Sequence, residues 1–182
     1  MGRESDDIDI ALDDMYGEDF AQMIDKHMHN GKETGHFGVI KANSAQSKHL
    51  ETATIRVDGI EIDLVNLRSE SYSEDSRVPT IEIGTPKDDA YRRDLTINSL
   101  FYNINDSKVE DFTESGLKDL KNKIVRTPLE PLQTFLDDPL RVLRTIRFAN
   151  RFEFTIVPEI LTAAKDTRVR VSKPNPYPLL YL

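Results

Sequence analysis

Residues 5–12, with the sequence SDDIDIAL, place two aspartates two positions apart inside a run that otherwise predicts a β-strand. Because side chains alternate between the two faces of a strand, the apolar residues at 8, 10 and 12 are expected on one face, opposite Asp7 and Asp9. Two carboxylates on one face repel each other unless a positive charge lies between them. The pattern is compatible with a solvated acidic face, and also with ligands for a hard cation such as Mg²⁺, which prefers carboxylate oxygens.

The composition bounds the classes of protein to which this chain can belong. With 182 residues, it is long enough for one domain, or for one domain and the start of another. The absence of cysteine excludes disulfides, thiolate chemistry and cysteine-based zinc sites. No apolar run approaches the roughly 20 residues that cross a bilayer, and the N-terminal residues lead directly into the predicted strand. We therefore expect an intracellular protein without a membrane partner, with the cytoplasm favoured over nucleus, mitochondrion or plastid.

The charge distribution is uneven along the chain. The net charge of −8, from 24 Lys and Arg against 32 Asp and Glu, argues against a surface dedicated to coating nucleic acid. It allows a local basic patch, and arginines cluster at positions 92, 93, 141, 144, 147 and 151. The sequence leaves the oligomeric state open.

Strands and helices alternate over the first two thirds of the chain. A helix is predicted over residues 20–28, with Gly31 as its stop, and a strand over 37–40. Asp58 and Gly59 separate two strand-like runs, 52–57 and 60–67, which predicts a hairpin with a type I′ turn. This hairpin places Asp63 in the middle of a strand, on the same kind of polar face as Asp7 and Asp9.

The middle of the chain continues this alternation. Residues 68–77 have no periodicity and many small polar side chains, which predicts a mobile loop. Further elements are predicted as a strand over 78–83, a segment over 88–104 that begins helical and ends extended, a strand over 109–112 and a helix over 113–121. The interleaving of strands and helices indicates an α/β domain with a mixed sheet.

The character of the sequence changes at about residue 128. Asp138 before Pro139 predicts the start of a helix, and the arginine-studded run LRVLRTIRFANRF predicts its body. A second helix is predicted over 158–166. The last residues, VSKPNPYPLLYL, contain three prolines and are incompatible with a continuing helix.

Several polar residues form sets that suit a nucleotide. Arg92 and Arg93 suit phosphate binding, because the guanidinium fork matches phosphate oxygens. Asp94 and Asn98 lie four apart, on one face if their segment is helical, where they are suited to a ribose hydroxyl. The chain has no glycine-rich P-loop.

A further pair lies at the start of the predicted arginine-rich helix. Asp138 and Arg141 are three residues apart and offer an acceptor and a donor fork to one planar partner, such as a nucleobase edge. Purely structural explanations exist for Asp138 and for the arginines. Asp138 is suited to capping the helix, Arg141, Arg144 and Arg147 to forming a solvated face, and Arg92 and Arg93 to pairing with Asp88 and Asp89.

Five segments in fixed order carry a resemblance to a known family: DIDIAL, IDLVNLRSESY, GTPKDDAYRRDLTINSLFYNI, VEDFTESGLKDLKNKIVRTPL and FLDDPLRVLRTIRFANRF. Together they resemble tRNA nucleotidyltransferase, the CCA-adding enzyme, in its bacterial and eukaryotic class and most like the eukaryotic branch. The similarity extends from about residue 2 to about residue 171. It implies a polymerase-β-like α/β head with a mixed sheet, followed by the start of an all-helical neck. We place these domains at 1–127 and 128–182.

The resemblance implies an activity and a role for each candidate residue. The family adds C, C and A to tRNA 3′ ends from CTP and ATP, with Mg²⁺ and without a nucleic-acid template. By position, Asp7 and Asp9 match the metal-binding D-x-D, and Asp63 matches a third catalytic carboxylate. The segment 69–77 matches a flexible loop. The nucleotide-binding positions implied are Arg92, Arg93, Asp94, Asn98, Asp138, Arg141 and Arg144, with Asp138 and Arg141 as the protein template for the base.

The ends of the chain depart from the family pattern. The family opens with a Gly-Gly-x-x-Arg-Asp segment that binds triphosphate, whereas this chain opens with Met1, Gly2, Arg3 and Glu4. We therefore expect a chain truncated at both ends relative to the family. Two alternative functions follow: a poly(A)-polymerase-like enzyme with the same head, and a non-catalytic module that binds nucleotide without turnover.

Overall fold

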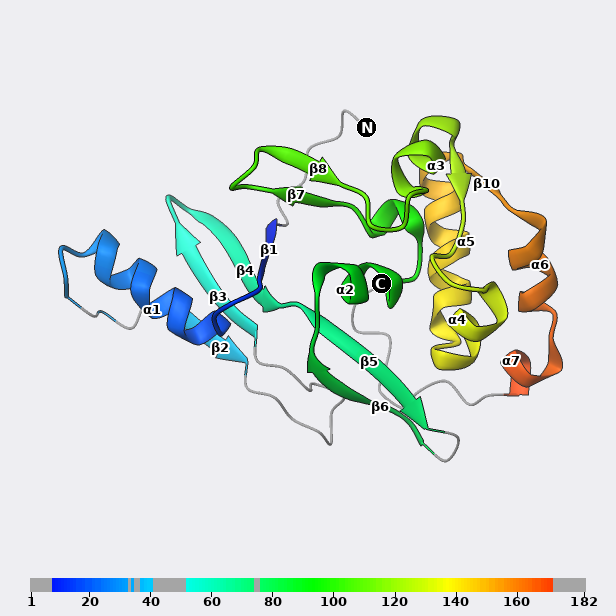
Figure 1. Ribbon diagram of the computed structural model, residues 1–182, viewed down its shortest axis with the longest axis horizontal. Helices are drawn as coiled ribbons and strands as arrows, with labels where there is room; N and C mark the ends of the chain where they lie inside the picture. The colour runs from blue at the N-terminus through cyan, green and yellow to red at the C-terminus, as the bar shows by residue number, and fades with distance from the viewer. Residues whose placement is uncertain (1–7, 33, 35–36, 41–51, 74–75, 172–182) are drawn as a thin grey trace. The chain divides into compact units, whose positions relative to one another are not determined.

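The structure is a computed structural model that describes residues 8–32, 34, 37–40, 52–73 and 76–171 (Figure 1). The chain divides into two compact units. Unit 1 comprises Met1–Arg68 and Ile81–Thr85, and unit 2 comprises Ser69–Thr80 and Pro86–Leu182. Asp7, the first residues of the chain and the proline-rich tail lie outside the described residues. Among the residues described, no helix is long and apolar enough to cross a membrane.

Unit 1 is built on a mixed sheet, as the sequence predicted. Its strands are β1 (Ile8–Leu12), β2 (Phe37–Ile40), β3 (Thr52–Val57) and β4 (Ile60–Asn66), in the spatial order β1-β4-β3-β2. Strand β1 runs parallel to β4, and β3 pairs antiparallel with both β4 and β2. The fold class expected from the sequence, α/β with a mixed sheet, is confirmed.

The turn between β3 and β4 has the predicted geometry. Asp58 and Gly59 both have positive φ, 49° and 83°, and Val57 pairs with Ile60 across them. Positive φ at both central residues is what a type I′ turn requires, and this turn matches the right-handed twist of the strands. The turn fixes the register of the hairpin and thereby the face on which Asp63 lies.

One face of this sheet is covered by helix α1 (Gly17–Met28) (Figure 1). The alternation in β1 and its neighbours directs apolar side chains to that face, where the buried residues are Leu12, Ala21, Ala53, Ile55 and Leu64. The start of α1 lies very close to the sheet: a Cβ atom added at Gly17 would be only 2.9 Å from the carbonyl oxygen of Leu64. The opposite face of the sheet is therefore the one left for the acidic side chains.

The prediction of a loop over residues 68–77 is wrong. The structure has strand β5 (Arg68–Ser73) and strand β6 (Ser76–Ile83), which pair as a two-stranded sheet. The stretch 68–77 is polar and has no alternation that would predict a strand, whereas pairing between the two backbones supplies its regular structure. The strand predicted over 78–83 is confirmed and begins two residues earlier.

Unit 2 is mostly helical. Its elements are α2 (Pro86–Tyr91), the 3₁₀ turn η2 (Thr96–Asn98), β7 (Phe101–Asn103), β8 (Lys108–Glu110), α3 (Gly116–Asn122), β9 (Ile124–Val125), α4 (Pro131–Asp137), α5 (Leu140–Phe152), β10 (Thr155–Ile156), α6 (Pro158–Ala164) and α7 (Thr167–Val171). The predicted helices over 113–121, 140–152 and 158–166 are confirmed in outline. The region after residue 128 is not all helical, because β10 pairs in parallel with β9.

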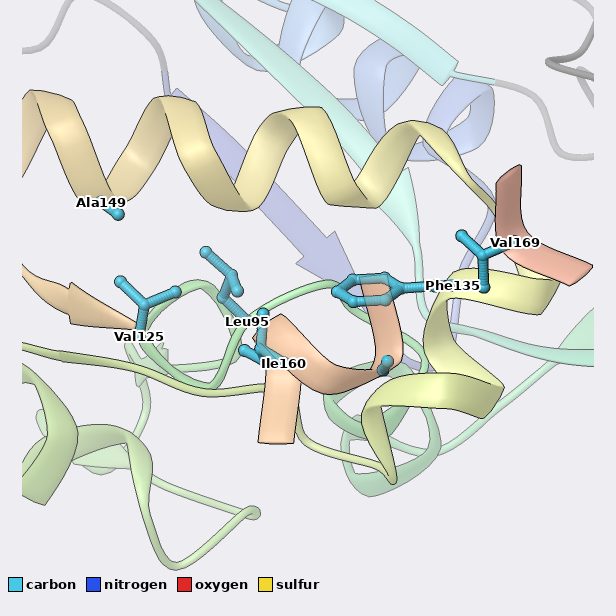
Figure 2. Packing of buried hydrophobic residues seen from close by; sticks show 7 residues of the cluster. Leu95, Val125, Phe135, Ala149, Ile160 and Val169 are labelled. Atoms are coloured by element: carbon cyan, nitrogen blue, oxygen red, sulfur yellow. The ribbon is translucent and has the colours of Figure 1, made fainter. Parts of the chain in front are cut away.

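A hydrophobic cluster of buried side chains joins the segments of unit 2 (Figure 2). Its buried side chains are Leu95, Val125, Phe135, Ala149, Ile160, Ala163 and Val169. Phe135 of α4 is fully buried and lies beneath α5 (Figure 2). Residues on both sides of position 128 contribute to this cluster, and the domain boundary at 127/128 stays a prediction.

The close approach at the start of α3 leads to the first testable prediction. A Cβ atom on Gly116 would lie 2.6 Å from the carbonyl oxygen of Thr96 and 2.8 Å from Cδ2 of Leu100. Gly116→Ala should therefore destabilise the protein by about 1–3 kcal/mol through overpacking, measured as a lower midpoint of thermal unfolding. The control is Gly38→Ala, whose Cβ would meet only the carbonyl oxygen of Thr54 at 4.0 Å. Equal midpoints for the two variants would contradict the prediction.

Candidate active site

Two of the three predicted strand acids lie side by side in unit 1. Asp9 of β1 and Asp63 of β4 are register partners in the parallel pair, so their side chains share one face of the sheet. Asp9 is exposed and Asp63 is half-buried. The hydroxyl of Thr54 on β3 donates a hydrogen bond of 2.6 Å to Oδ1 of Asp63, which orients that carboxylate. The third predicted acid, Asp7, lies outside the described residues.

The donor chemistry of this pair fits a hard cation. Carboxylate oxygens are the ligands that Mg²⁺ prefers, and a cation between Asp9 and Asp63 would offset the repulsion of like charges on neighbouring strands. Among the described residues, no group of three or more acidic or histidine side chains is placed to hold a metal. The pair therefore supplies two oxygen donors to any cation bound at this face.

The arginines of the predicted phosphate-binding segment are anchored by one buried acid in unit 2. Asp89 is 1% exposed. Its Oδ1 accepts from Nε of Arg92 at 2.9 Å, and its Oδ2 accepts from Nε of Arg93 at 2.8 Å. The structural explanation proposed from the sequence, that these arginines pair with an acid, is therefore correct for Asp89. Sequence reasoning did not include Asp89 in the site, although its spacing of three and four residues from the arginines is the relevant signal.

Arg93 is held from two further sides. Its Nη1 donates to the backbone carbonyl of Asn98 at 3.1 Å, and its guanidinium carbon lies 5.1 Å from the ring centroid of Phe101. Arg93 is thus oriented by the protein itself, which lowers the entropy cost of binding an anion.

The next predicted pair, Asp94 and Asn98, meets in a different way from that expected. Helix α2 ends at Tyr91, so the segment is not helical at Asp94, and the helical spacing argument is wrong. The bend that follows and the turn η2 nevertheless bring Nδ2 of Asn98 to 3.0 Å from Oδ1 of Asp94. The other oxygen, Oδ2, accepts from Nε of Arg144 at 2.7 Å. Asp94 is 7% exposed, so this carboxylate is buried and charge-paired.

Asp138 and Arg141 lie together at the start of α5. Oδ1 of Asp138 accepts from the backbone N–H of Leu140 at 3.0 Å, so the predicted capping interaction is present. Oδ2 of the same carboxylate lies 4.0 Å from Nε of Arg141. One oxygen therefore serves the helix, while the other faces the arginine that the sequence paired with it.

The remaining arginines of α5 contact aromatic rings. The guanidinium carbons of Arg144 and Arg147 lie 5.5 Å and 5.1 Å from the ring centroid of Phe148. The guanidinium carbon of Arg151 lies 5.6 Å from the ring centroid of Phe152. Arg144 therefore has two kinds of contact within unit 2: the ring of Phe148, and the carboxylate of Asp94, which in turn bonds to Asn98.

A second prediction tests the anchoring acid. Asp89→Asn removes the charge that both Arg92 and Arg93 face, and hydrogen bonds to charged groups contribute about 1.5–3 kcal/mol each. Because the arginine side chains are 18% and 34% exposed, water offsets part of the loss, and we expect destabilisation of about 2–3 kcal/mol. Urea unfolding measures it. Asp106→Asn is the control, because its partner Lys108 is exposed and exposed pairs contribute little. An Asp89→Asn midpoint equal to that of Asp106→Asn would refute the anchoring role.

Comparisons with known proteins agree on one family. Residues 1–126 match the model described as the Poly A polymerase head domain. The mitochondrial CCA tRNA nucleotidyltransferase of Saccharomyces cerevisiae is 51% identical over 177 residues, which are 94% of this chain and 32% of that protein. This chain therefore spans about a third of the length of that relative.

Solved structures give the same result. A CCA-adding enzyme in an apo form superposes with a TM-score of 0.71 and 30% identity, over 88% of this chain and 35% of that one. A tRNA nucleotidyltransferase complexed with a primer tRNA and an incoming ATP analog superposes with a TM-score of 0.66 and 25% identity, over 93% of this chain and 43% of that one. The chain belongs to the poly(A) polymerase head domain family, among relatives that are tRNA nucleotidyltransferases.

Proposed function

We propose that this chain is the nucleotidyltransferase part of a CCA-adding enzyme, which transfers C, C and A from CTP and ATP to the 3′ end of tRNA. The observation that carries the proposal is that α5 brings together two sets of polar contacts in unit 2. Asp138 and Arg141 open α5, Arg144 of the same helix bonds to Asp94, and Asp94 bonds to Asn98. These sets provide, in one unit, the groups that the base and the ribose of a nucleotide require.

The arginines near α2 supply the anion-binding part of the proposed site. Arg92 and Arg93 each use Nε to bond to Asp89. Nη2 of Arg92 bonds to the same acid and Nη1 of Arg93 donates to the carbonyl of Asn98, so both guanidinium groups are oriented, and their planar forks match phosphate oxygens in shape and charge. In this proposal Arg92 and Arg93 bind the triphosphate, and Asp89 keeps them extended toward it.

Base choice follows from the chemistry of Asp138 and Arg141. A carboxylate accepts from the exocyclic amino group that cytosine and adenine share, and the guanidinium donates to the neighbouring ring nitrogen or carbonyl. Uracil and guanine present a carbonyl where that amino group would lie, so Oδ2 of the carboxylate would face an acceptor while Oδ1 keeps its bond to the N–H of Leu140. An unpaired buried polar group costs about 1–3 kcal/mol, enough for roughly ten- to a hundred-fold discrimination.

A divalent cation completes the proposed reaction. Asp9 and Asp63 would hold it, with Asp7 as a further ligand, and Mg²⁺ is the ion that their oxygens suit. When bound, such an ion neutralises triphosphate charge and activates the attacking hydroxyl. The part of Thr54 is to hold Asp63 in one orientation through its 2.6 Å hydrogen bond.

The location of the protein is proposed from its relatives. Two yeast relatives are named as mitochondrial enzymes. We infer an intracellular location for this chain on that ground, because tRNA and nucleoside triphosphates are intracellular substrates.

The reaction itself is tested by incubating the purified 182-residue chain with Mg²⁺, labelled CTP and ATP, and a tRNA that lacks its CCA end. Addition of two C residues and then one A is the expected result. Extended A tracts would assign the chain to poly(A)-polymerase-like activity. Nucleotide binding without any addition would identify a non-catalytic module and overturn the proposal.

Base reading is tested with Asp138→Asn. Asn is also a good helix cap, so the helix should be retained, while the acceptor that faces the amino group of C and A becomes a neutral amide. We expect the preference for CTP and ATP over UTP and GTP to fall by roughly ten- to a hundred-fold, measured by binding titrations with all four triphosphates. The matched control is Asp166→Asn, whose carboxylate caps α7 by accepting from the backbone N–H of Arg168 at 2.9 Å. An unaltered ranking would reduce Asp138 to a cap.

A further inference from the structure

Arg144 makes a charged contact with a residue far away in the sequence. Its Nε donates to Oδ2 of Asp94 at 2.7 Å across 50 residues of sequence. We propose that Arg144 is a positioning residue for base choice, an inference that rests on the proposed function. By holding Asp94, it fixes the ribose-contacting pair, Asp94 and Asn98, relative to the base-reading pair at the start of α5.

The geometry favours this indirect role over direct contact with nucleotide. The Nε edge of Arg144 is already engaged by a carboxylate that is 7% exposed. Its guanidinium carbon also lies 5.5 Å from the ring centroid of Phe148 on its own helix. A charge-assisted bond to a buried acid and an aromatic contact orient the side chain from two sides.

Asp94 depends on Arg144 for its own orientation. Oδ1 of Asp94 accepts from Asn98 and Oδ2 accepts from Arg144, so the two oxygens are held by different segments of the chain. Without Arg144, a buried carboxylate loses its charged donor and keeps a neutral one. Such a group reorients or takes up a new partner, and its alignment with a ribose hydroxyl is lost.

The bond between Arg144 and Asp94 also constrains the position of α5, which carries Arg141. Arg141 and Arg144 lie three residues apart and so on neighbouring positions of one helix surface. Both arginines lie within α5, in which the hydroxyl of Thr145 also donates to the carbonyl oxygen of Arg141 at 2.7 Å. Arg144 therefore attaches the helix that reads the base to the acid proposed to contact the ribose.

The test is Arg144→Lys, which keeps the charge but replaces a planar fork by a single ammonium. We expect the ratio of CTP and ATP affinity to UTP and GTP affinity to fall about tenfold, because a small displacement of one reading group against the other is costly. The binding of inorganic triphosphate, which has no base, should stay unchanged. Arg147→Lys is the matched control, since Arg147 lies on the same helix and contacts the same Phe148 ring at 5.1 Å.

The outcomes separate the two proposals. If the unmodified chain binds all four triphosphates equally, the proposed function and the role of Arg144 both fail. If the unmodified chain discriminates and Arg144→Lys keeps the ranking, only the positioning role is overturned. An equal weakening of every ligand, inorganic triphosphate included, together with a lower melting temperature would identify a structural residue and also overturn it.

A double-mutant cycle provides the second measurement. Arg144→Gln and Asp94→Asn each remove one side of the bond, and residues that act through one contact have non-additive effects. We expect the loss of base preference in the double variant to equal that of the more severe single variant. Additive losses would show that the two residues act independently and would overturn the proposal.

Discussion

A carboxylate that is buried must be paired with a cation or with several hydrogen-bond donors, and unit 2 is arranged around this constraint. Asp89 and Asp94 are 1% and 7% exposed. Each is satisfied by donors that the proposed function also needs. Asp89 accepts hydrogen bonds from Arg92 and Arg93, and Asp94 accepts from Asn98 and Arg144, all four of which are candidate site residues. A buried carboxylate without a partner would lower the stability of the fold. The bonds that prevent this also hold the arginine side chains in place, so the same contacts serve the stability of the fold and the geometry of the site.

The acids of unit 1 are under the opposite constraint. Asp9 and Asp63 are register partners on a face that α1 leaves uncovered, and Asp9 is exposed. Carboxylates on neighbouring strands repel each other, and a cation bound at this face would offset that repulsion. The hydrogen bond from Thr54 orients one of them without adding positive charge. Such a pair suits a diffusible cation, whereas the buried acids of unit 2 suit fixed arginine partners.

Local patterns predicted local structure well. The alternation around Asp9, the turn at Asp58 and Gly59 and the helix after Pro139 all follow from side-chain periodicity and backbone preference, and the structure contains each of them. The prediction failed where regularity comes from pairing instead of side-chain pattern. Strand β5 and the first two residues of β6 were expected as a loop, because the polar stretch 68–77 gives no period by which a strand can be recognised.

The same distinction between local pattern and long-range pairing applies to the candidate site. The sequence alone determined the α/β class, the mixed sheet and the residue types of the site, because periodicity and short-range spacing are properties of neighbours along the chain. Only the tertiary structure decided which groups meet. It places Asp63 in register with Asp9, joins Asp94 to Asn98 through a bend instead of a helix, and gives Asp94 its partner Arg144 from 50 residues away. Spacing rules reach about four residues, whereas the partner of a buried charge is selected by packing, which brings distant segments together around a common core.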